Sequence, residues 1–389
     1  MIKGTNKIKY YPYLDGLRAI AAIYVVLHHT ISQFNFDYPS LNFIEKYSII
    51  SFFYGHLAVD FFIVLSGFCL TIPIVNANSF KLKNGIVLFY KRRIRRIVFP
   101  YFLALIFSLV LIKTLVGVKT GRHWDSSLPV STNDVITHFL LIQDVFSSSM
   151  FKINHALWTI SVECRIYLFF PLLLLIWRKF SGGMMLLTTL LISMFIFIST
   201  AYLNYFFNLK IERGLDGVNP YIILFGLGML GSYLSFSSNL KVSAMRNNRL
   251  WTALCVVLIF IFFILQRMPI ISAWPYFFEV SDVIFGCWSL CFLVIVSGNK
   301  LPGLQKILSF KPLVFIGTFA YSIYLIHAPL IQLIWQYLIL PLGVTELKGY
   351  YIMMILGTPL ILGVSYLFYL ICERPFMNHK KPKIVSAIT

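Results

Sequence analysis

Several ionisable side chains lie within long apolar stretches of the sequence. Burying a charge in hydrocarbon costs about 2.5–3.5 kcal/mol at the centre of a membrane helix, so a residue of this kind is a candidate functional group. The set consists of Arg18, His28, His29, Asp60, Glu163, Arg165, Glu279, Asp282 and His327. Guanidinium groups bind anions, whereas imidazole and carboxylate groups transfer protons.

Arg18 and His29 show the clearest spacing in this set. They are eleven residues apart, which on an α-helix is about three turns plus ~20°, with a rise of ~16 Å. The two side chains therefore share one helix face, and His28 points about 80° away from it. This pattern predicts an anion-binding group at one end of a helix and a base at the other. The alternative is that Arg18 reaches lipid phosphate and His29 is a satisfied core histidine.

Residues 91–96 form a basic cluster, Lys-Arg-Arg-Ile-Arg-Arg. Arg93 and Arg96 are three residues apart and so share a helix face. Their guanidinium groups are suited to bidentate contacts with phosphate and would extend the site that begins at Arg18. A basic cluster beside an apolar segment is also an ordinary membrane anchor, and this alternative stays open.

Two carboxylates are candidates to assist His29. Glu163 and Asp60 both fall in the same half of their apolar segments as His29. A histidine facing a carboxylate is a usual arrangement for general-base catalysis on a hydroxyl group. The alternative for Asp60 is a structural ion pair with Arg165. Glu163 is two residues from Arg165 and therefore lies on another helix face, which disfavours an ion pair between those two.

Three further residues have weaker patterns. Glu279 and Asp282 share a helix face, and we expect them to form structural pairs. His327 precedes Pro329, so it either lines the same cavity as His29 or bonds a carbonyl group that the proline leaves free. Cys164 lies next to Glu163, but burial in an apolar segment does not favour a reactive thiolate.

Long apolar segments must position these residues. The 389-residue chain is 59% apolar and only 12% charged, too few charges to cover a water-soluble globule. Segments near 20 residues long cross a bilayer as helices, since the backbone must satisfy its own hydrogen bonds there. We therefore predict an all-α, polytopic membrane helical bundle that forms a single domain over residues 1–389. The ten predicted spans are 14–32, 52–75, 97–117, 156–177, 183–201, 219–235, 251–266, 276–297, 312–339 and 350–373, and we expect Pro329 to kink or end its helix.

The distribution of basic residues predicts the orientation. Most of the 33 Lys and Arg residues fall on the side that holds both termini, which the positive-inside rule assigns to the cytoplasm. The net charge of +19 then reflects orientation and contact with anionic membrane lipid, and not nucleic-acid binding. The longest outer loop is about 118–155. The six cysteines show no metal-ligand or redox spacing, and we expect no metal.

Six blocks of this sequence, in order, resemble acyltransferase family 3. The first is Tyr-Leu-Asp-Gly-Leu-Arg-Ala-Ile-Ala-Ala at 13–22, with His29 following. The others are Val-Asp-Phe-Phe-Ile-Val-Leu-Ser-Gly-Phe at 59–68, Arg-Arg-Ile-Arg-Arg-Ile at 92–97, Trp-Thr-Ile-Ser-Val-Glu at 158–163, Tyr-Ser-Ile-Tyr-Leu-Ile-His-Ala-Pro-Leu at 321–330 and Glu-Arg-Pro at 373–375. They extend over residues 13–375, nearly the whole chain. Cys164 and Arg165 depart from the acidic and Gln-like residues that are usual in the family.

The resemblance implies an integral-membrane O-acyltransferase of the bacterial cytoplasmic membrane. It implies that Arg18 and His29 are an essential pair, that Arg93 and Arg96 are a basic pair, and that Glu163 is the acidic position. It also implies a cytoplasmic acyl-CoA donor, with acetyl-CoA favoured, and a hydroxyl acceptor on a surface or lipid-linked carbohydrate such as O-antigen, capsule or exopolysaccharide. Many relatives carry a fused extracytoplasmic domain, and we expect none in this chain.

Together, the residues and the resemblance suggest one mechanism. Arg18, Arg93 and Arg96 hold the CoA phosphates, and His29 either accepts the acceptor's proton or carries the acyl group. Glu163, with Asp60, orients the imidazole. Three rival interpretations stay open, namely a flippase or transporter of a lipid-linked sugar, a scaffold in a glycan-assembly complex, and an acyltransferase with a different acceptor. The sequence also leaves open whether the chain forms a homo-oligomer.

Overall fold

The computed structural model describes residues 10–207, 220–246, 249–268, 277–298 and 301–377. Over these residues the fold is helical and contains no β-strand. Nine helical segments of the described chain are long and apolar enough to cross a membrane, and a tenth candidate is a pair of helices with a bend of 100° between them. The prediction of an all-α bundle with about ten spans is therefore confirmed.

Every predicted span coincides with an observed helical segment. The segments are α1 (Pro12–Ser32), α2 (Phe43–Ile50) followed by α3 (Gly55–Asn76), α4 (Gly85–Arg93) continuing through a π-helical turn into α5 (Phe99–Leu111), α8 (Trp158–Lys179), α9 (Gly182–Phe207), α10 (Tyr221–Phe236) with the bent α11 (Leu240–Arg246), α12 (Leu250–Arg267), α14 (Phe277–Ser297), α17 (Ala320–Ile334), and α18 (Glu346–Ile352) leading into α19 (Thr358–Phe368). The predicted first residues of two spans, 219 and 276, lie outside the described residues.

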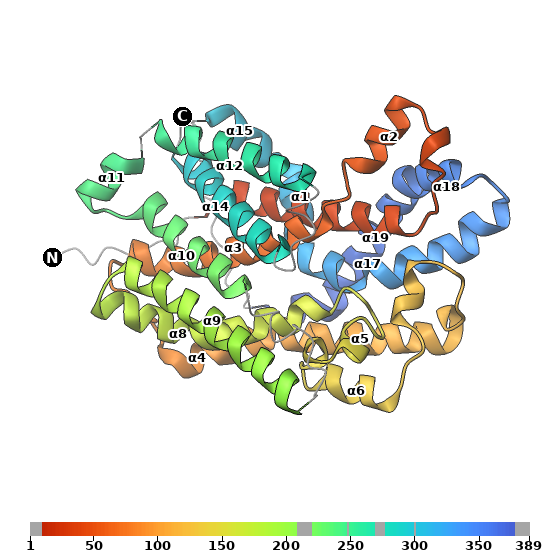
Figure 1. Cartoon of the computed structure of the whole chain (residues 1–389), viewed down its shortest axis with the longest axis horizontal. Coiled ribbons are helices and arrows are strands. Elements are labelled where there is room, and N and C mark those ends of the chain that lie inside the picture. The colour runs from red at the N-terminus through yellow and green to blue at the C-terminus, as the bar shows by residue number, and fades with distance from the viewer. Residues whose placement is uncertain (1–9, 208–219, 247–248, 269–276, 299–300, 378–389) are drawn as a thin grey trace.

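The connecting segments gather at two opposite ends of the bundle. In Figure 1 the long helices run across the view, with α2, α6 (Thr132–Phe139) and α18 at one end and α4 and α11 at the other. This separation matches the alternation of loops predicted from the basic residues. Which end faces the cytoplasm stays a prediction.

Helix α1 lies at the centre of the arrangement that positions the candidate residues. It packs against α3, α16 (Lys311–Gly317) and α17. Helix α3 in turn packs extensively against α10. A Cβ atom at Gly228 of α10 would lie 1.9 Å from the Val64 carbonyl oxygen of α3. Only glycine allows the two backbones to approach this closely, as at small-residue contacts between membrane helices.

Pro329 does not end its helix, contrary to one of the two predicted outcomes. Helix α17 continues through Pro329 to Ile334, and the predicted 312–339 span is instead interrupted between Gly317 and Ala320. A proline leaves the carbonyl group four residues earlier without its helical partner. Here that group belongs to Leu325, and it accepts a hydrogen bond of 3.0 Å from Asn154 Nδ2. The loop before α8 is thereby fastened to α17.

Candidate active site

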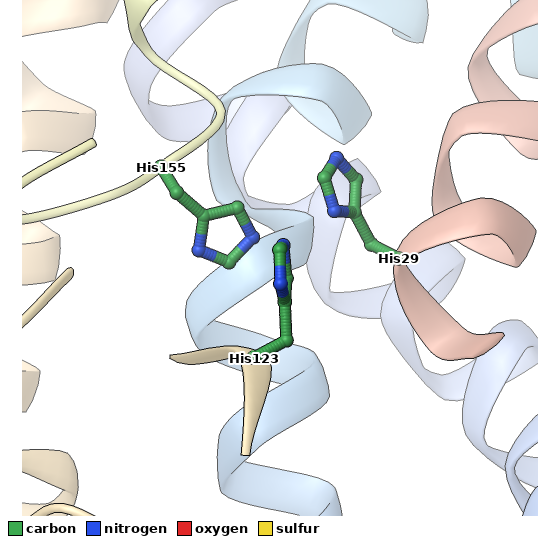
Figure 2. A group of neighbouring side chains, drawn as sticks. All are labelled: His29, His123 and His155. Carbon is green, nitrogen blue, oxygen red and sulfur yellow. The ribbon is translucent and has the colours of Figure 1, made fainter. Parts of the chain in front are cut away.

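Four histidines from separate parts of the chain meet at one end of α1. The ring of His29 lies 4.9 Å from that of His155, 5.0 Å from that of His327 and 5.5 Å from that of His123, between centroids. The rings of His123 and His155 are 4.4 Å apart. Figure 2 shows the side chains of His29, His123 and His155 converging from three different segments. We call these four residues the histidine cluster.

His123 reaches the cluster because its loop folds back onto the helices. The preceding residue, Arg122, forms two hydrogen bonds of 2.6 and 3.1 Å with the Glu346 carboxylate. Its guanidinium carbon also lies 4.8 Å from the ring centroid of Trp335, in a cation–π contact. An ion pair that is partly exposed stabilises weakly, by about 1 kcal/mol or less, but together with ring stacking it fixes the loop's path.

Polar side chains at the end of α1 hold the same loop. Gln33 donates a 2.7 Å hydrogen bond to Gln332 of α17, and Gln332 donates one of 3.3 Å to the Thr120 hydroxyl. Gln33 and Gln332 are buried. Buried amide groups that satisfy one another fix a unique arrangement of the elements they join, which here are α1, α17 and the loop that carries His123.

His155 is held through both its ring and its backbone. Its Nδ1 lies 3.1 Å from the Ser127 hydroxyl, and its backbone N–H donates to the same oxygen at 3.2 Å. The neighbouring Asn154 donates to the Ser108 hydroxyl at 3.2 Å and to the Leu325 carbonyl. These bonds connect α5, α17 and the outer loop, and they leave Nε2 of His155 directed away from its bonded side.

The cluster contains ring nitrogens that have no hydrogen-bond partner among the described residues. They are Nδ1 of His29, Nε2 of His155 and Nε2 of His327. Nδ1 of His327 contacts the Tyr324 carbonyl oxygen at 2.8 Å, so Nε2 carries the free lone pair. Burial is the main cause that lowers the pKa of His123 and the pKa of His155, the latter strongly. Those two imidazoles are therefore neutral at pH 7 and able to accept a proton or bind a ligand.

The three predicted arginines gather towards the other end of α1. Arg18 forms an ion pair with Asp15 and contacts the Cys69 sulfur at 3.1 Å. Arg96 also acts electrostatically on the Cys69 thiol. Arg93 lies over the Tyr167 ring, with 6.0 Å between its guanidinium carbon and the ring centroid. Three guanidinium groups in one region provide the multiple N–H donors that phosphate groups bind.

Glu163 does not face His29 as predicted. Its carboxylate accepts a hydrogen bond of 3.0 Å from Ser66 and another from Tyr167. Tyr167 is the residue over which Arg93 stacks, so Glu163 belongs to the arginine end of the site. Tyr324 lies between the arginine end and the histidine cluster. It is close enough to Glu163 for an electrostatic interaction, and its ring centroid is 5.8 Å from that of His327.

Asp60 and Arg165 also have partners that sequence spacing did not reveal. The Asp60 carboxyl group is completely buried beside that of Asp282, and His56 Nε2 is 4.0 Å from Asp282. Two carboxylate charges in one buried site would repel each other. Arg165 pairs with Asp144 of the outer loop, so the considered ion pair with Asp60 does not form. Asp282 has Asp60, Glu279 and His56 as neighbours, which agrees with the structural role expected for it.

The structure thus brings together the predicted arginines but adds unpredicted residues around His29. The ring of His327 lies beside that of His29, and Asn154 takes the Leu325 carbonyl that Pro329 frees, so His327 does not bond that carbonyl. No spacing or motif connects His123 or His155 with His29. The available signal was the freed Leu325 carbonyl, because a buried acceptor requires a donor from elsewhere in the chain.

Comparison with known proteins supplies independent information. The acyltransferase 3 family model, described as an acyltransferase domain, matches residues 11–372. O-acetyltransferase OatA of Staphylococcus aureus is 25% identical over 377 residues, covering 92% of this chain and 56% of that protein. Peptidoglycan O-acetyltransferase OatA of Listeria monocytogenes is 25% identical over 341 residues, covering 84% and 50%. This chain spans about half the length of these curated relatives. No solved structure matches it.

Proposed function

Because the chain belongs to the acyltransferase 3 family, we propose that it is a membrane-embedded O-acyltransferase. The group transferred is acetyl, the donor is acetyl-CoA on the cytoplasmic side, and the acceptor is a hydroxyl group of a cell-envelope carbohydrate. The names of the relatives favour acetyl as the group and peptidoglycan as the first acceptor to test. We place the protein in the bacterial cytoplasmic membrane, which is where a cytoplasmic donor meets an acceptor outside.

One observation carries this proposal. Guanidinium groups surround one end of α1 and unpaired imidazole nitrogens the other. The charged phosphates of CoA fit the first end, and the chemistry of a hydroxyl nucleophile fits the second. The predicted rise of ~16 Å between Arg18 and His29 gives the extended pantetheine arm of the donor room to reach from one end to the other.

The proposed reaction transfers one proton and one acyl group. His29 accepts the proton of the acceptor hydroxyl as the oxygen attacks the thioester carbonyl. The carbon–sulfur bond breaks, and the CoA sulfur receives the proton. Glu163 acts at the arginine end, where its bond to Tyr167 fixes the ring over which Arg93 stacks. We keep Asp60 among the proposed catalytic residues, and its carboxyl group lies buried beside that of Asp282.

The test compares two adjacent histidines on one helix. Membranes that contain the chain are supplied with labelled acetyl-CoA, and ester formation on isolated peptidoglycan is followed by mass spectrometry. His29→Ala should lower the rate by about 10²–10⁴-fold, as expected on removal of a general base. His28→Ala is the matched control, because the His28 ring turns to the Phe52 carbonyl, 2.9 Å away. Full activity in the His29 variant and an inactive His28 variant would refute the proposal, and movement of a lipid-linked sugar without ester formation would favour a flippase.

A further inference from the structure

We propose that His29, His123 and His155 form a binding site for a divalent transition-metal ion, with zinc as the resident ion, which activates the acceptor hydroxyl. This inference rests on the proposed acyl transfer, and it reassigns His29 from proton acceptor to metal ligand. One nitrogen from each of the three rings lies within 4.8 Å of the other two. The three residues come from α1, the 123–127 turn and the segment before α8, so the fold itself brings them together (Figure 2).

The geometry is close to that of a three-histidine zinc site. Zinc–nitrogen bonds of about 2.0–2.1 Å place tetrahedral ligand atoms about 3.3 Å apart, so the nitrogens need to approach by no more than about 1.5 Å. His123 lies on a turn and is partly exposed, so its ring can make most of this adjustment. His29 Nδ1 and His155 Nε2 are buried without a hydrogen-bond partner among the described residues. A buried polar atom without a partner is costly, and a metal ion would satisfy both atoms.

The surroundings of the rings match those of metal ligands. A ligating histidine usually holds its second nitrogen to a carbonyl, carboxylate or hydroxyl group, which fixes the ring and its tautomer. Ser127 provides this contact for His155. The His327 ring is held in the same way by the Tyr324 carbonyl oxygen. Two of the four rings in the cluster are therefore oriented by bonds to their Nδ1 atoms, with Nε2 free.

The type of ligand selects the type of metal. Imidazole nitrogen suits zinc and other late first-row ions, whereas magnesium and calcium require oxygen ligands. The three ring nitrogens are neutral donors, so the ion keeps its full charge for an oxygen atom in the fourth position. In sites with three protein ligands and one open position, the ion lowers the pKa of bound water to about 7. A carbohydrate hydroxyl in that position would be activated in the same way.

The proton balance of the reaction is then complete without His29 as the base. The hydroxyl proton passes to Nε2 of His327, whose ring is 5.0 Å from that of His29. The oxygen forms the ester bond as the carbon–sulfur bond breaks, and His327 returns the proton to the CoA sulfur. No oxidant, reductant or further reactant is needed. His29 remains essential, as a ligand.

The experiment measures metal in the intact chain purified in detergent without a polyhistidine tag. After exposure to zinc and removal of free ion, mass spectrometry of the metal should find about one ion per chain. Cobalt exchanged into the site should give the visible absorption of tetrahedral Co²⁺. His123→Ala and His155→Ala should each lose both signals, and His56→Gln should keep them as the control. Heat stability in detergent verifies that the variants are folded. If one does not fold, the cobalt spectrum of the unaltered chain still decides the question.

Three results would overturn the inference. They are a metal-free unaltered chain, equal metal content in His123→Ala and His155→Ala, and full acyl transfer after the ion has been stripped. Acyl transfer by a chain without metal would leave the proposed function intact. Conversely, an ion bound through His123 and His155 in a chain that transfers no acyl group would leave the metal site intact and reject the proposed function. The two proposals can therefore fail separately.

Discussion

Replacement of Pro329 by alanine should make the protein more stable and less active. A proline inside a helix costs about 3 kcal/mol relative to alanine. Alanine restores an N–H group that competes for the Leu325 carbonyl, which now accepts from Asn154. Losing that hydrogen bond costs about 0.5–1.5 kcal/mol, so the net gain in the free energy of unfolding should be about 1.5–2.5 kcal/mol. His155, next to Asn154, should leave the cluster more often. If the position of His155 in the histidine cluster is destabilised by about 1 kcal/mol, the rate of acyl transfer falls about fivefold.

The assay pairs a thermal unfolding measurement in detergent with the rate of acyl transfer. Pro73→Ala is the matched control, since Pro73 also lies inside a helix, α3, but does not face the loop that carries His155. The control should gain stability and keep its rate. Asn154→Ala should lower both stability and rate, because it loses the bonds to Ser108 and Leu325 together. A Pro329→Ala protein that is less stable and fully active would refute the reasoning, as would an equal loss of rate in the Pro73 control.

Three further predictions concern the donor end, the loop and pH. Arg93→Ala should raise the KM for acetyl-CoA about tenfold and leave the acceptor KM unchanged, because a charge-assisted bond to phosphate is worth about 1.5–3 kcal/mol; a change in the acceptor KM alone would contradict it. Asp144→Asn should destabilise the chain by about 3 kcal/mol, since it leaves Arg165 unpaired, and unfolding curves that coincide with those of the unaltered chain would contradict this. Burial lowers the pKa of His123 and of His155 below 6.5, so the unfolded chain binds more protons there and stability should fall as pH drops below 6.5; unfolding midpoints at pH 7 and pH 5 test this, and equal midpoints would reject it.

The membrane helices could be predicted from sequence because their cause is local. A backbone in hydrocarbon must form its own hydrogen bonds, so apolar length alone located the segments. The Arg18–His29 spacing was informative for the same reason, since a single continuous helix, α1, fixes it. Likewise, Arg93 ends α4 and Arg96 lies in the π-helical turn that continues it, so both belong to one helical stretch. Within one continuous helix, the number of residues between two side chains is enough to predict their relative positions.

The histidine cluster could not be predicted because its causes are contacts between distant segments. His123 lies in a turn without a periodic pattern, and its place depends on Arg122 meeting Glu346 more than two hundred residues away. His155 depends on a carbonyl freed by Pro329. The predicted contact between Glu163 and His29 rested on their similar depth along two helices. Depth does not determine which way each helix turns its side chains. Tyr167, one turn further along α8, takes the Glu163 carboxylate instead.

The separation of the two ends of α1 also has an electrostatic consequence. Two unit charges ~16 Å apart interact by about 1 kcal/mol at an effective dielectric constant of about 20, and by about 3 kcal/mol at 5 Å. In the reaction that we propose, the histidine cluster becomes positive, whether His29 takes up a proton or holds an ion. Arginines next to it would oppose that charge, and the penalty would double for a divalent ion. At the distance that α1 imposes, the guanidinium groups can hold phosphate while the cluster becomes charged at a small cost. Under the proposed reaction, a spacing near three helical turns therefore satisfies two demands together, because it would fit an extended donor and keep the guanidinium charges away from the site of proton transfer.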